Sequence, residues 1–287
     1  MSGPESVLVW MLSLNREYSK AEYDTIFNLC KICYPATNPK YEPTNADSFR
    51  QYITQLLPVL MMRHRRVPRA KWQDHVTANG KHWIDHIYSS MPEHAGRPRP
   101  PSIGYQLTFQ NSLCGMAVTQ GTPQSVVNIG LGIKQAKVEP KNASVQSYVE
   151  SLSHKLTHLE LSNLANKPDE VVLKRLCILL ALKESYIKAI GQPIGFDFTR
   201  LEFDVPNHTA TGDGKPLHGW EFRVFSANLG VARGTILKKE QYECVCAYFR
   251  GGSDVTYIFH ETTQQLENWV QFINIDQLMA VSSKLAA

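Results

Sequence analysis

The sequence predicts an α+β protein made of two similar halves that meet near residue 123. Its 287 residues suffice for one large domain or for two of about 140 residues each. Short apolar segments rich in β-branched residues alternate with longer segments whose apolar residues recur at helical spacing. The order strand, helices, strands is followed by strand, helix, strands. The expected halves are therefore residues 1–123 and residues 124–287, although no literal sequence repeat relates them.

The N-terminal half is expected to begin with a strand at residues 7–14, which are short, apolar and rich in strand-forming residues. Residues 20–33 and 46–63 have helical periodicity. The pair Asn79-Gly80 then indicates a tight hairpin turn, because both residue types tolerate a positive φ. Residues 105–120 are expected to form a strand and its continuation.

The C-terminal half is expected to start with a strand-like block at residues 124–138. A helix follows from about residue 168 to residue 190. Pro168 suits the first turn of a helix, and Gly191 suits its end. The remaining β-like segments are residues 198–205, 220–226, 241–249 and 255–260, before a helical or irregular piece from about residue 262.

Composition limits the classes of partner and compartment. The formal net charge of +4 is too small to indicate nucleic acid, although it suits a phosphorylated or acidic partner. No apolar run reaches the 18 residues that a membrane span needs, and the N-terminus has no signal-peptide pattern. The six cysteines are scattered, unlike a secreted disulfide framework. We therefore expect a cytoplasmic protein without a nucleic-acid or membrane partner.

The third helix contains a carboxylate where an apolar residue is expected. Leu176, Leu180 and Ile187 mark an apolar stripe, and Glu184 interrupts that stripe. A buried carboxylate is costly without a cation beside it, and Lys188, four residues later, can supply one. Periodicity alone leaves two interpretations open: a helical ion pair, or a helix that binds metal and phosphate.

The segment LALKESYIKAIGQPIGFDFTRLEFDV (180–205) resembles the W-x-x-K-E-S/A-x-x-K-x-x-G signature of Sfp-type 4'-phosphopantetheinyl transferases. The residues in register are Lys183, Glu184, Ser185, Lys188 and Gly191. The resemblance implies two pseudo-symmetric α/β halves of phosphopantetheinyl-transferase type, with the site in the cleft between them. It also implies that the glutamate binds Mg²⁺, while the lysines contact coenzyme A phosphates or assist proton transfer.

The same resemblance assigns coenzyme-binding candidates elsewhere in the chain. Lys81 corresponds to the lysine of a G-K-P hairpin, although His82 stands where proline is usual. Arg50 is a candidate phosphate contact. Gln106 takes the place of the asparagine in an F-N-[IV]-S-H segment, and Lys134 is a further candidate phosphate contact.

Four further positions depart from the family pattern. Phe109 replaces the histidine that holds the coenzyme, and Leu180 replaces the signature tryptophan. Gly132 replaces the aspartate that is the principal metal ligand, and Lys134 stands where a second acidic ligand is frequent. We expect these substitutions to make the site more apolar and roomier, and to leave Glu184 as the one protein carboxylate available to a metal.

The leading hypothesis is therefore a phosphopantetheinyl-transferase fold redeployed in polyketide-type secondary metabolism. The protein would be a metal-independent cyclase that forms a lactone or pyrone, or releases the product, from a pantetheine-tethered chain. Glu184, Lys183 and Lys188 would be the catalytic residues, supplying acid, base and charge. This reaction would need no cofactor.

Two alternatives remain open. The first is an active transferase that moves 4'-phosphopantetheine from coenzyme A to a carrier-protein serine, with Mg²⁺ as cofactor and Glu184 as its ligand. The second is a non-catalytic relic that binds coenzyme A or a partner. For the cyclase and for the transferase, the expected partner is an acyl carrier protein or its pantetheine-tethered acyl chain.

Overall fold

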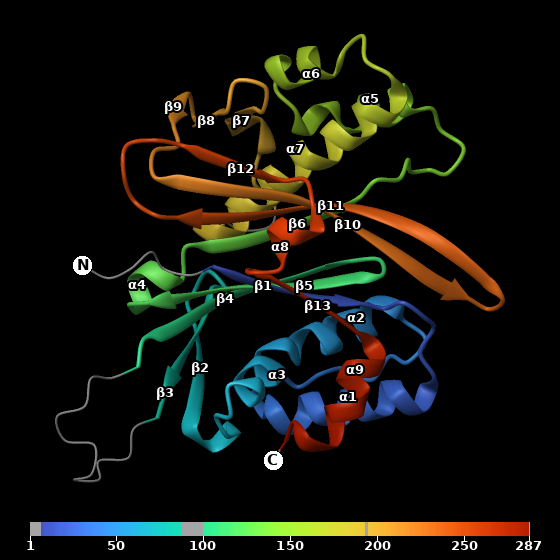
Figure 1. Cartoon of the computed structure of the whole chain (residues 1–287), viewed down its shortest axis with the longest axis vertical. Helices are drawn as coiled ribbons and strands as arrows, with labels where there is room; N and C mark the ends of the chain where they lie inside the picture. The colour runs from blue at the N-terminus through green and yellow to red at the C-terminus, as the bar shows by residue number, and fades with distance from the viewer. Residues whose placement is uncertain (1–6, 88–99, 193–194, 287) are drawn as a thin grey trace. The chain divides into compact units, whose positions relative to one another are not determined.

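The computed structural model describes residues 7–87, 100–192 and 195–286. Within them lie sheets of six, four and three strands together with helices, which confirms the predicted α+β class (Figure 1). The chain forms two compact units. The first unit comprises residues 1–127, 230–238 and 269–287, and the second unit comprises residues 128–229 and 239–268. The division at residue 127 lies close to the expected boundary, but two later segments return to the first unit.

The first unit is built on the six-stranded sheet, whose strand order is β13-β1-β5-β4-β3-β2. Its strands are β1 (Leu8–Ser13), β2 (Trp72–Val76), β3 (His82–His86), β4 (Ser102–Gln110), β5 (Leu113–Gly121) and β13 (Val270–Asn274). Among the described pairs of this sheet, only β1–β13 is parallel, with Val9 opposite Val270. A strand near the C-terminus therefore completes a sheet begun near the N-terminus.

The helices of the first unit supply most of its core. They are α1 (Lys20–Cys33), α2 (Ala46–Gln55), α3 (Leu57–His64), α4 (Pro123–Val126) and α9 (Ile275–Val281). The single helix predicted for residues 46–63 is wrong, because two helices meet at Leu56. Pro58 explains the break: proline has no N–H to continue the helical hydrogen bonds and is tolerated in a first turn.

Two other predicted segments each contain two elements. The expected strand at residues 105–120 is the hairpin β4–β5, whose turn places Asn111 at φ 49°. Asparagine tolerates this left-handed conformation better than most residues. The expected block at residues 124–138 is the short helix α4 followed by a strand.

The second unit contains a four-stranded sheet of order β12-β10-β11-β6 and a small sheet of order β7-β8-β9. Its strands are β6 (Ile129–Gln135), β7 (Leu201–Asp204), β8 (Thr209–Gly212), β9 (Lys215–Pro216), β10 (Trp220–Arg233), β11 (Ile236–Phe249) and β12 (Thr256–His260). Strands β10 and β11 extend beyond the second unit, because residues 230–238 belong to the first. The long hairpin was predicted only over its apolar parts.

The helix α7 (Asp169–Ile190) organises the second unit and packs along β6 (Figure 1). The shorter helices are α5 (Val145–Leu152), α6 (His158–Leu164) and α8 (Thr263–Leu266). Gly191 ends α7 at φ 71°, as predicted from its position. Short 3₁₀ turns lie at Pro35–Thr37, Arg69–Lys71, Ser153–Lys155, Phe198–Arg200 and Ser282–Lys284. Within the described ranges, no helix has the length and hydropathy of a membrane span.

Candidate functional site

Close packing of α7 against β6 positions the candidate site in the second unit. A Cβ atom added at Gly130 would lie 1.9 Å from the carbonyl oxygen of Ser185. One added at Gly132 would lie 2.2 Å from the carbonyl oxygen of Ala181. Because both distances are shorter than any real contact, glycine is required at these two positions. The helix backbone therefore lies directly on the strand backbone.

This packing brings Glu184 of α7 against Lys134 of β6. The Lys134 Nζ atom lies 2.5 Å from Glu184 Oε2, and the Lys188 Nζ atom lies 2.5 Å from Glu184 Oε1. Lys188 also donates a hydrogen bond to the carbonyl oxygen of Leu131, at 3.3 Å. We refer to Lys134, Glu184 and Lys188 as the Glu184 cluster. The helical ion pair expected from the sequence is present, and a third residue from the neighbouring strand joins it.

The Glu184 cluster is partly enclosed and positively charged overall. The side chains of Lys134, Glu184 and Lys188 are 28%, 18% and 25% exposed, respectively. Burial raises the pKa of the Glu184 carboxyl, but the ammonium groups of Lys188 and Lys134 outweigh this effect and lower it below its ordinary value. Glu184 is therefore ionised at neutral pH. Two ammonium groups against one carboxylate suit contact with an anion such as a phosphate.

Lys183 lies apart from this cluster and is fully buried. Its Nζ atom lies 2.7 Å from Glu160 Oε2 and donates to the carbonyl oxygens of Phe198, at 2.9 Å, and Leu201, at 2.7 Å. Burial lowers the pKa of Lys183 despite the neighbouring carboxylate. The ammonium group thus fastens the chain after α7 to the helix. The catalytic role suggested for Lys183 stays a prediction.

Glu160 was not identified as important from the sequence. Its side chain has no exposed surface, and its Oε1 atom accepts a hydrogen bond from the backbone N–H of Phe203, at 2.9 Å. The local signal was available, because Thr157 and Glu160 form the capping box that starts α6. That motif explains why a glutamate occurs there, but not its pairing with Lys183.

The candidate residues of the first unit are Arg50, Lys81 and Gln106. The Arg50 Nε atom donates to the carbonyl oxygen of Asn111, at 2.6 Å, and its Nη1 atom to Asp47, at 2.6 Å. Lys81 is half-buried, which lowers its pKa. The Gln106 amide donates to the carbonyl oxygen of Leu107, at 3.2 Å. Their coenzyme-binding roles remain predictions.

The prediction that Gly132 makes the site roomier is wrong. The space beside its Cα atom is occupied by the carbonyl group of Ala181, not by a cavity. Leu180 is buried within the core of the second unit, whereas Phe109 of the first unit is partly exposed.

The residues present do not fit a magnesium site of the carboxylate type. Both oxygens of Glu184 lie next to ammonium groups, and no side chain can be accommodated at Gly132 without displacing α7. The part of the chain that the structure describes contains no group of three or more His, Cys, Asp or Glu side chains placed to hold a metal. Hard oxygen ligands, which Mg²⁺ prefers, are thus reduced to a single carboxylate already paired with two lysines.

Comparison with known proteins gives a relative that aligns over most of the chain. The "4'-phosphopantetheinyl transferase pptA" of Paxillus involutus is 32% identical over 246 residues, which cover 82% of this chain and 86% of the relative. No protein-family model matches the sequence.

Shorter alignments reach mammalian proteins named "L-aminoadipate-semialdehyde dehydrogenase-phosphopantetheinyl transferase". The Mus musculus protein is 32% identical and the Homo sapiens protein 30% identical, each over 106 residues. Each of these alignments covers 37% of this chain and 32% of the mammalian protein.

Proposed function

Since the chain belongs to the 4'-phosphopantetheinyl transferase family, we propose that it transfers 4'-phosphopantetheine from coenzyme A to a serine of a carrier protein. The observation that carries this proposal is the Glu184 cluster, in which Lys134 and Lys188 lie on either side of an ionised carboxylate. The similarity to a fungal protein named as such a transferase supports it across most of the chain.

The proposed reaction is a single phosphoryl transfer. The serine hydroxyl oxygen attacks the diphosphate phosphorus that bears the pantetheine arm. A new phosphorus–oxygen bond forms, and the bond to the other phosphate of the diphosphate breaks. Adenosine 3',5'-bisphosphate leaves with the electron pair, and the serine proton is taken up by a base.

The residues of the Glu184 cluster have different roles in the proposed reaction. The carboxylate of Glu184, which is ionised at neutral pH, holds the two ammonium groups in position, and the serine proton passes to solvent water. The ammonium groups of Lys134 and Lys188 contact diphosphate oxygens and stabilise the negative charge that develops in the transition state. Lys134 thus supplies positive charge at a position where the family pattern frequently has an acidic metal ligand.

We do not propose the metal-independent cyclase that was the leading hypothesis from the sequence. The relatives found are named as transferases, and none is named as a cyclase or linked to polyketides. The apolar room that this hypothesis required at Gly132 is filled by α7. Both of its main supports are therefore lost.

A specific observation favours a second candidate, a family member that binds coenzyme A without transferring its arm. Glu184 already has an ammonium partner at each oxygen, and Gly132 provides no second carboxylate. A site of this kind retains charge for phosphate binding while lacking the family's principal metal ligand, the aspartate that Gly132 replaces. The two candidates predict the same binding and different turnover.

The test is mass spectrometry of an apo carrier protein incubated with the full chain and coenzyme A, with either Mg²⁺ or a chelator. We expect the mass of the carrier protein to increase by one phosphopantetheine. Glu184→Gln and Lys134→Gln should each slow this conversion by about 10²-fold or more, the usual effect of removing an acid–base or electrostatic group.

Lys167→Gln is the matched control, because it removes one positive charge from an exposed position of the second unit. Its rate should equal that of the unmodified chain. Coenzyme A binding by calorimetry without any change in carrier mass would reject the transferase in favour of the second candidate. Neither binding nor modification would reject both.

A further inference from the structure

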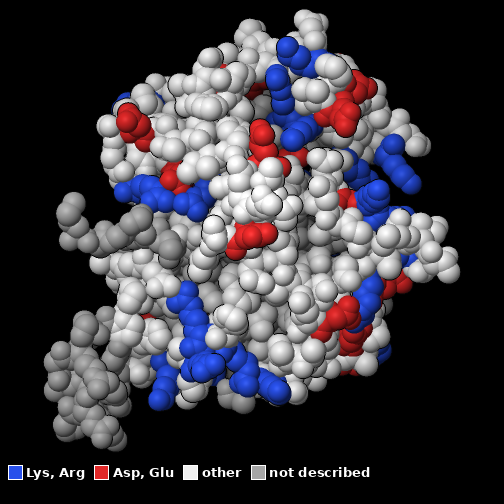
Figure 2. Space-filling view, in the orientation of Figure 1, with Lys and Arg blue, Asp and Glu red and all other residues white. Residues whose placement is uncertain are grey.

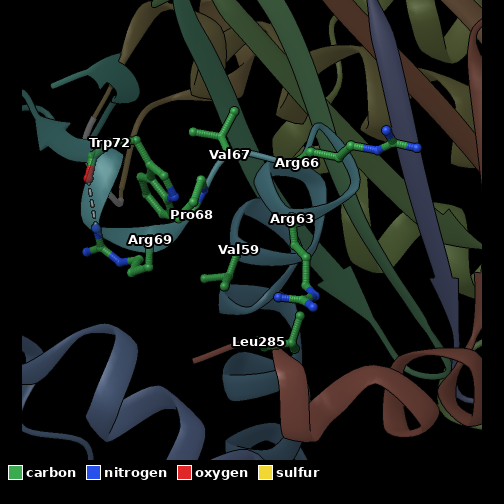
Figure 3. A pocket seen from close by; sticks show the side chains of 8 residues that line it. All are labelled: Val59, Arg63, Arg66, Val67, Pro68, Arg69, Trp72 and Leu285. Atoms are coloured by element: carbon green, nitrogen blue, oxygen red, sulfur yellow. Dashed lines mark hydrogen bonds between the residues drawn. The ribbon is translucent and has the colours of Figure 1, made fainter. Parts of the chain in front are cut away.

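The first unit contains a cavity of about 350 Å³ beside the end of α3 (Figure 3). Arg63, Arg66 and Arg69 line it together with apolar residues that include Val59, Trp72 and Leu285. No acidic side chain is among the described residues that line it. Its volume lies at the lower end of the range for small-molecule pockets, roughly 300–1,000 Å³.

One of the three arginines is fixed in position by the backbone. The Arg69 Nη1 atom donates to the carbonyl oxygen of Trp72, at 2.9 Å, and its Nη2 atom to that of Cys33, at 3.2 Å. The guanidinium carbon lies 4.1 Å from the centre of the Trp72 ring. Figure 3 shows the Arg69–Trp72 hydrogen bond at one side of the cavity. These contacts orient the cation without neutralising it.

The other two arginines have no counter-charge among the residues that the structure describes. Arg63 and Arg66 are exposed, and their guanidinium groups make no hydrogen bond or ion pair with any described residue. Figure 3 shows Arg63 extending toward Leu285, and Arg66 extending from the rim away from Trp72. Favourable interaction with the helix dipole explains a cation at Arg63, in the last turn of α3, but does not explain Arg66 and Arg69.

Arg66 also has a backbone conformation that its side chain does not favour. Its φ is 59°, in the left-handed region, where a residue other than glycine costs about 1–2 kcal/mol. Glycine would satisfy this turn at lower cost. The stability of the turn therefore gives no reason for an arginine at position 66.

The surrounding surface has the same sign of charge. Between residues 63 and 71 the chain has four arginines and a lysine and no acidic residue. In the space-filling view, Lys and Arg atoms gather over the region where α3 and β2 lie, with few acidic atoms among them (Figure 2). This charge favours an anionic ligand.

We propose that this cavity binds a small phosphate monoester with an apolar or aromatic body. The arginines that line the cavity, without an acidic neighbour among the described lining residues, give it a positive charge that suits a doubly charged phosphate, whose oxygens match the planar fork of arginine. Val59, Trp72 and Leu285 are buried side chains that offer an apolar wall to the carbon part of the ligand. The proposal does not depend on the transferase activity, since none of these residues belongs to the Glu184 cluster.

The experiment measures binding of phenyl phosphate to the full chain by calorimetry, with inorganic phosphate and phenol as separate probes. We expect phenyl phosphate to bind at least about tenfold more tightly than inorganic phosphate, the effect of adding an apolar contact of roughly 1.4 kcal/mol. Phenol should not bind measurably. Equal affinity of phenyl phosphate and inorganic phosphate, or binding of phenol alone, would overturn the proposed combination of charge and apolar wall.

The decisive variant is Arg63→Gln combined with Arg66→Gly, which removes two cations and leaves a residue suited to the left-handed turn. Its affinity for phenyl phosphate should fall about tenfold or more, the scale of losing a charge-assisted hydrogen bond. Thermal unfolding should show no loss of stability. The matched control is Lys238→Gln with Lys239→Gln, which removes two exposed cations elsewhere and should change the affinity less than about twofold.

If both double variants lose the same affinity for phenyl phosphate, the loss is explained by the change in net charge alone, and the assigned site is overturned. An unchanged affinity in the arginine variant would do the same. Because the variant leaves the Glu184 cluster intact, carrier-protein modification should proceed at the rate of the unmodified chain if the transferase proposal holds. Failure of one proposal is thereby distinguishable from failure of the other.

Discussion

Lys183 and Glu160 depend on each other, because neither side chain has any exposed surface. Changing Lys183 to methionine would leave the carboxylate of Glu160 buried without its cation. We expect Lys183→Met to lower the free energy of unfolding by about 3–5 kcal/mol, the usual cost of breaking a buried ion pair. Urea denaturation measures this directly.

A double variant controls for the change in side-chain volume. In Lys183→Met with Glu160→Gln no unpaired charge is buried, and the amide oxygen can still accept from Phe203. This variant should recover about half or more of the lost stability. A loss below about 1 kcal/mol in the single variant would contradict the structural role that we assign to Lys183.

Glu184 gives a prediction about pH. The pKa of its carboxyl is lower in the folded protein than in the unfolded chain, so ionised Glu184 stabilises the fold above the ordinary carboxyl pKa, about 4.3. This contribution is lost as the pH falls through the lower, folded-state pKa. The difference in unfolding free energy between the unmodified chain and Glu184→Gln should therefore be greatest near neutral pH and shrink below about pH 4.

Urea denaturation over a series of pH values tests this, and Lys134→Met provides the comparison. Removing one of the two ammonium groups weakens the attraction that lowers the pKa, so Glu184→Gln should have a smaller and less pH-dependent effect in that background. If the unmodified chain and the Glu184→Gln variant instead differ by a constant amount from neutral pH into acid, the carboxylate gains nothing from its lysine neighbours.

The contact between α7 and β6 determines what residue 132 can be. A Cβ atom there would meet the carbonyl oxygen of Ala181 at 2.2 Å. Gly132→Ala should therefore destabilise the protein by about 1–3 kcal/mol, as overpacking usually does. Gly132→Asp should cost more, because it also buries a charge, and it should not create a rise in the melting temperature with added Mg²⁺.

Gly214→Ala separates this packing effect from backbone conformation. Gly214 has a φ of 74°, but a Cβ atom there would have no neighbour within 4 Å. Its substitution should cost about 1 kcal/mol, from the loss of the left-handed conformation alone. The close contact would be disproved if thermal or chemical unfolding showed a smaller loss of stability for Gly132→Ala than for Gly214→Ala. A rise in the melting temperature of Gly132→Asp with added Mg²⁺ would also contradict it.

At the scale of the whole molecule, the C-terminal segment belongs to the first unit. Strand β13 extends the sheet beside β1, and Ile275, Leu278 and Leu285 are buried in the same core. A chain ending at residue 268 should therefore lose the hydrogen-exchange protection of β1, because the strand becomes an unpaired edge and the core is opened.

A chain ending at residue 285 is the control, since it retains β13 and the three buried side chains. Exchange measured peptide by peptide should find β1 protected in this control and unprotected in the shorter chain. Equal protection of β1 in both chains would mean that the parallel β1–β13 pair contributes little to the first unit.

The sequence by itself determined the α+β class, most element positions and the family. Local signals were sufficient for these: an apolar period for α1, Asn79-Gly80 for the β2–β3 hairpin, and Gly191 for the end of α7. The segment at residues 180–205 identified the family, because the residues that match the family signature lie close together in the sequence. It also predicted the Glu184–Lys188 pair, because residues four apart meet on a helix.

Only the tertiary structure decided which charged residues meet across elements. It placed Lys134 of β6 against Glu184, buried Lys183 against Glu160, and closed the space beside Gly132 with Ala181. None of these contacts follows from periodicity, since each joins segments more than 20 residues apart. The charge available at the site, and the room beside it, depend on such long-range packing.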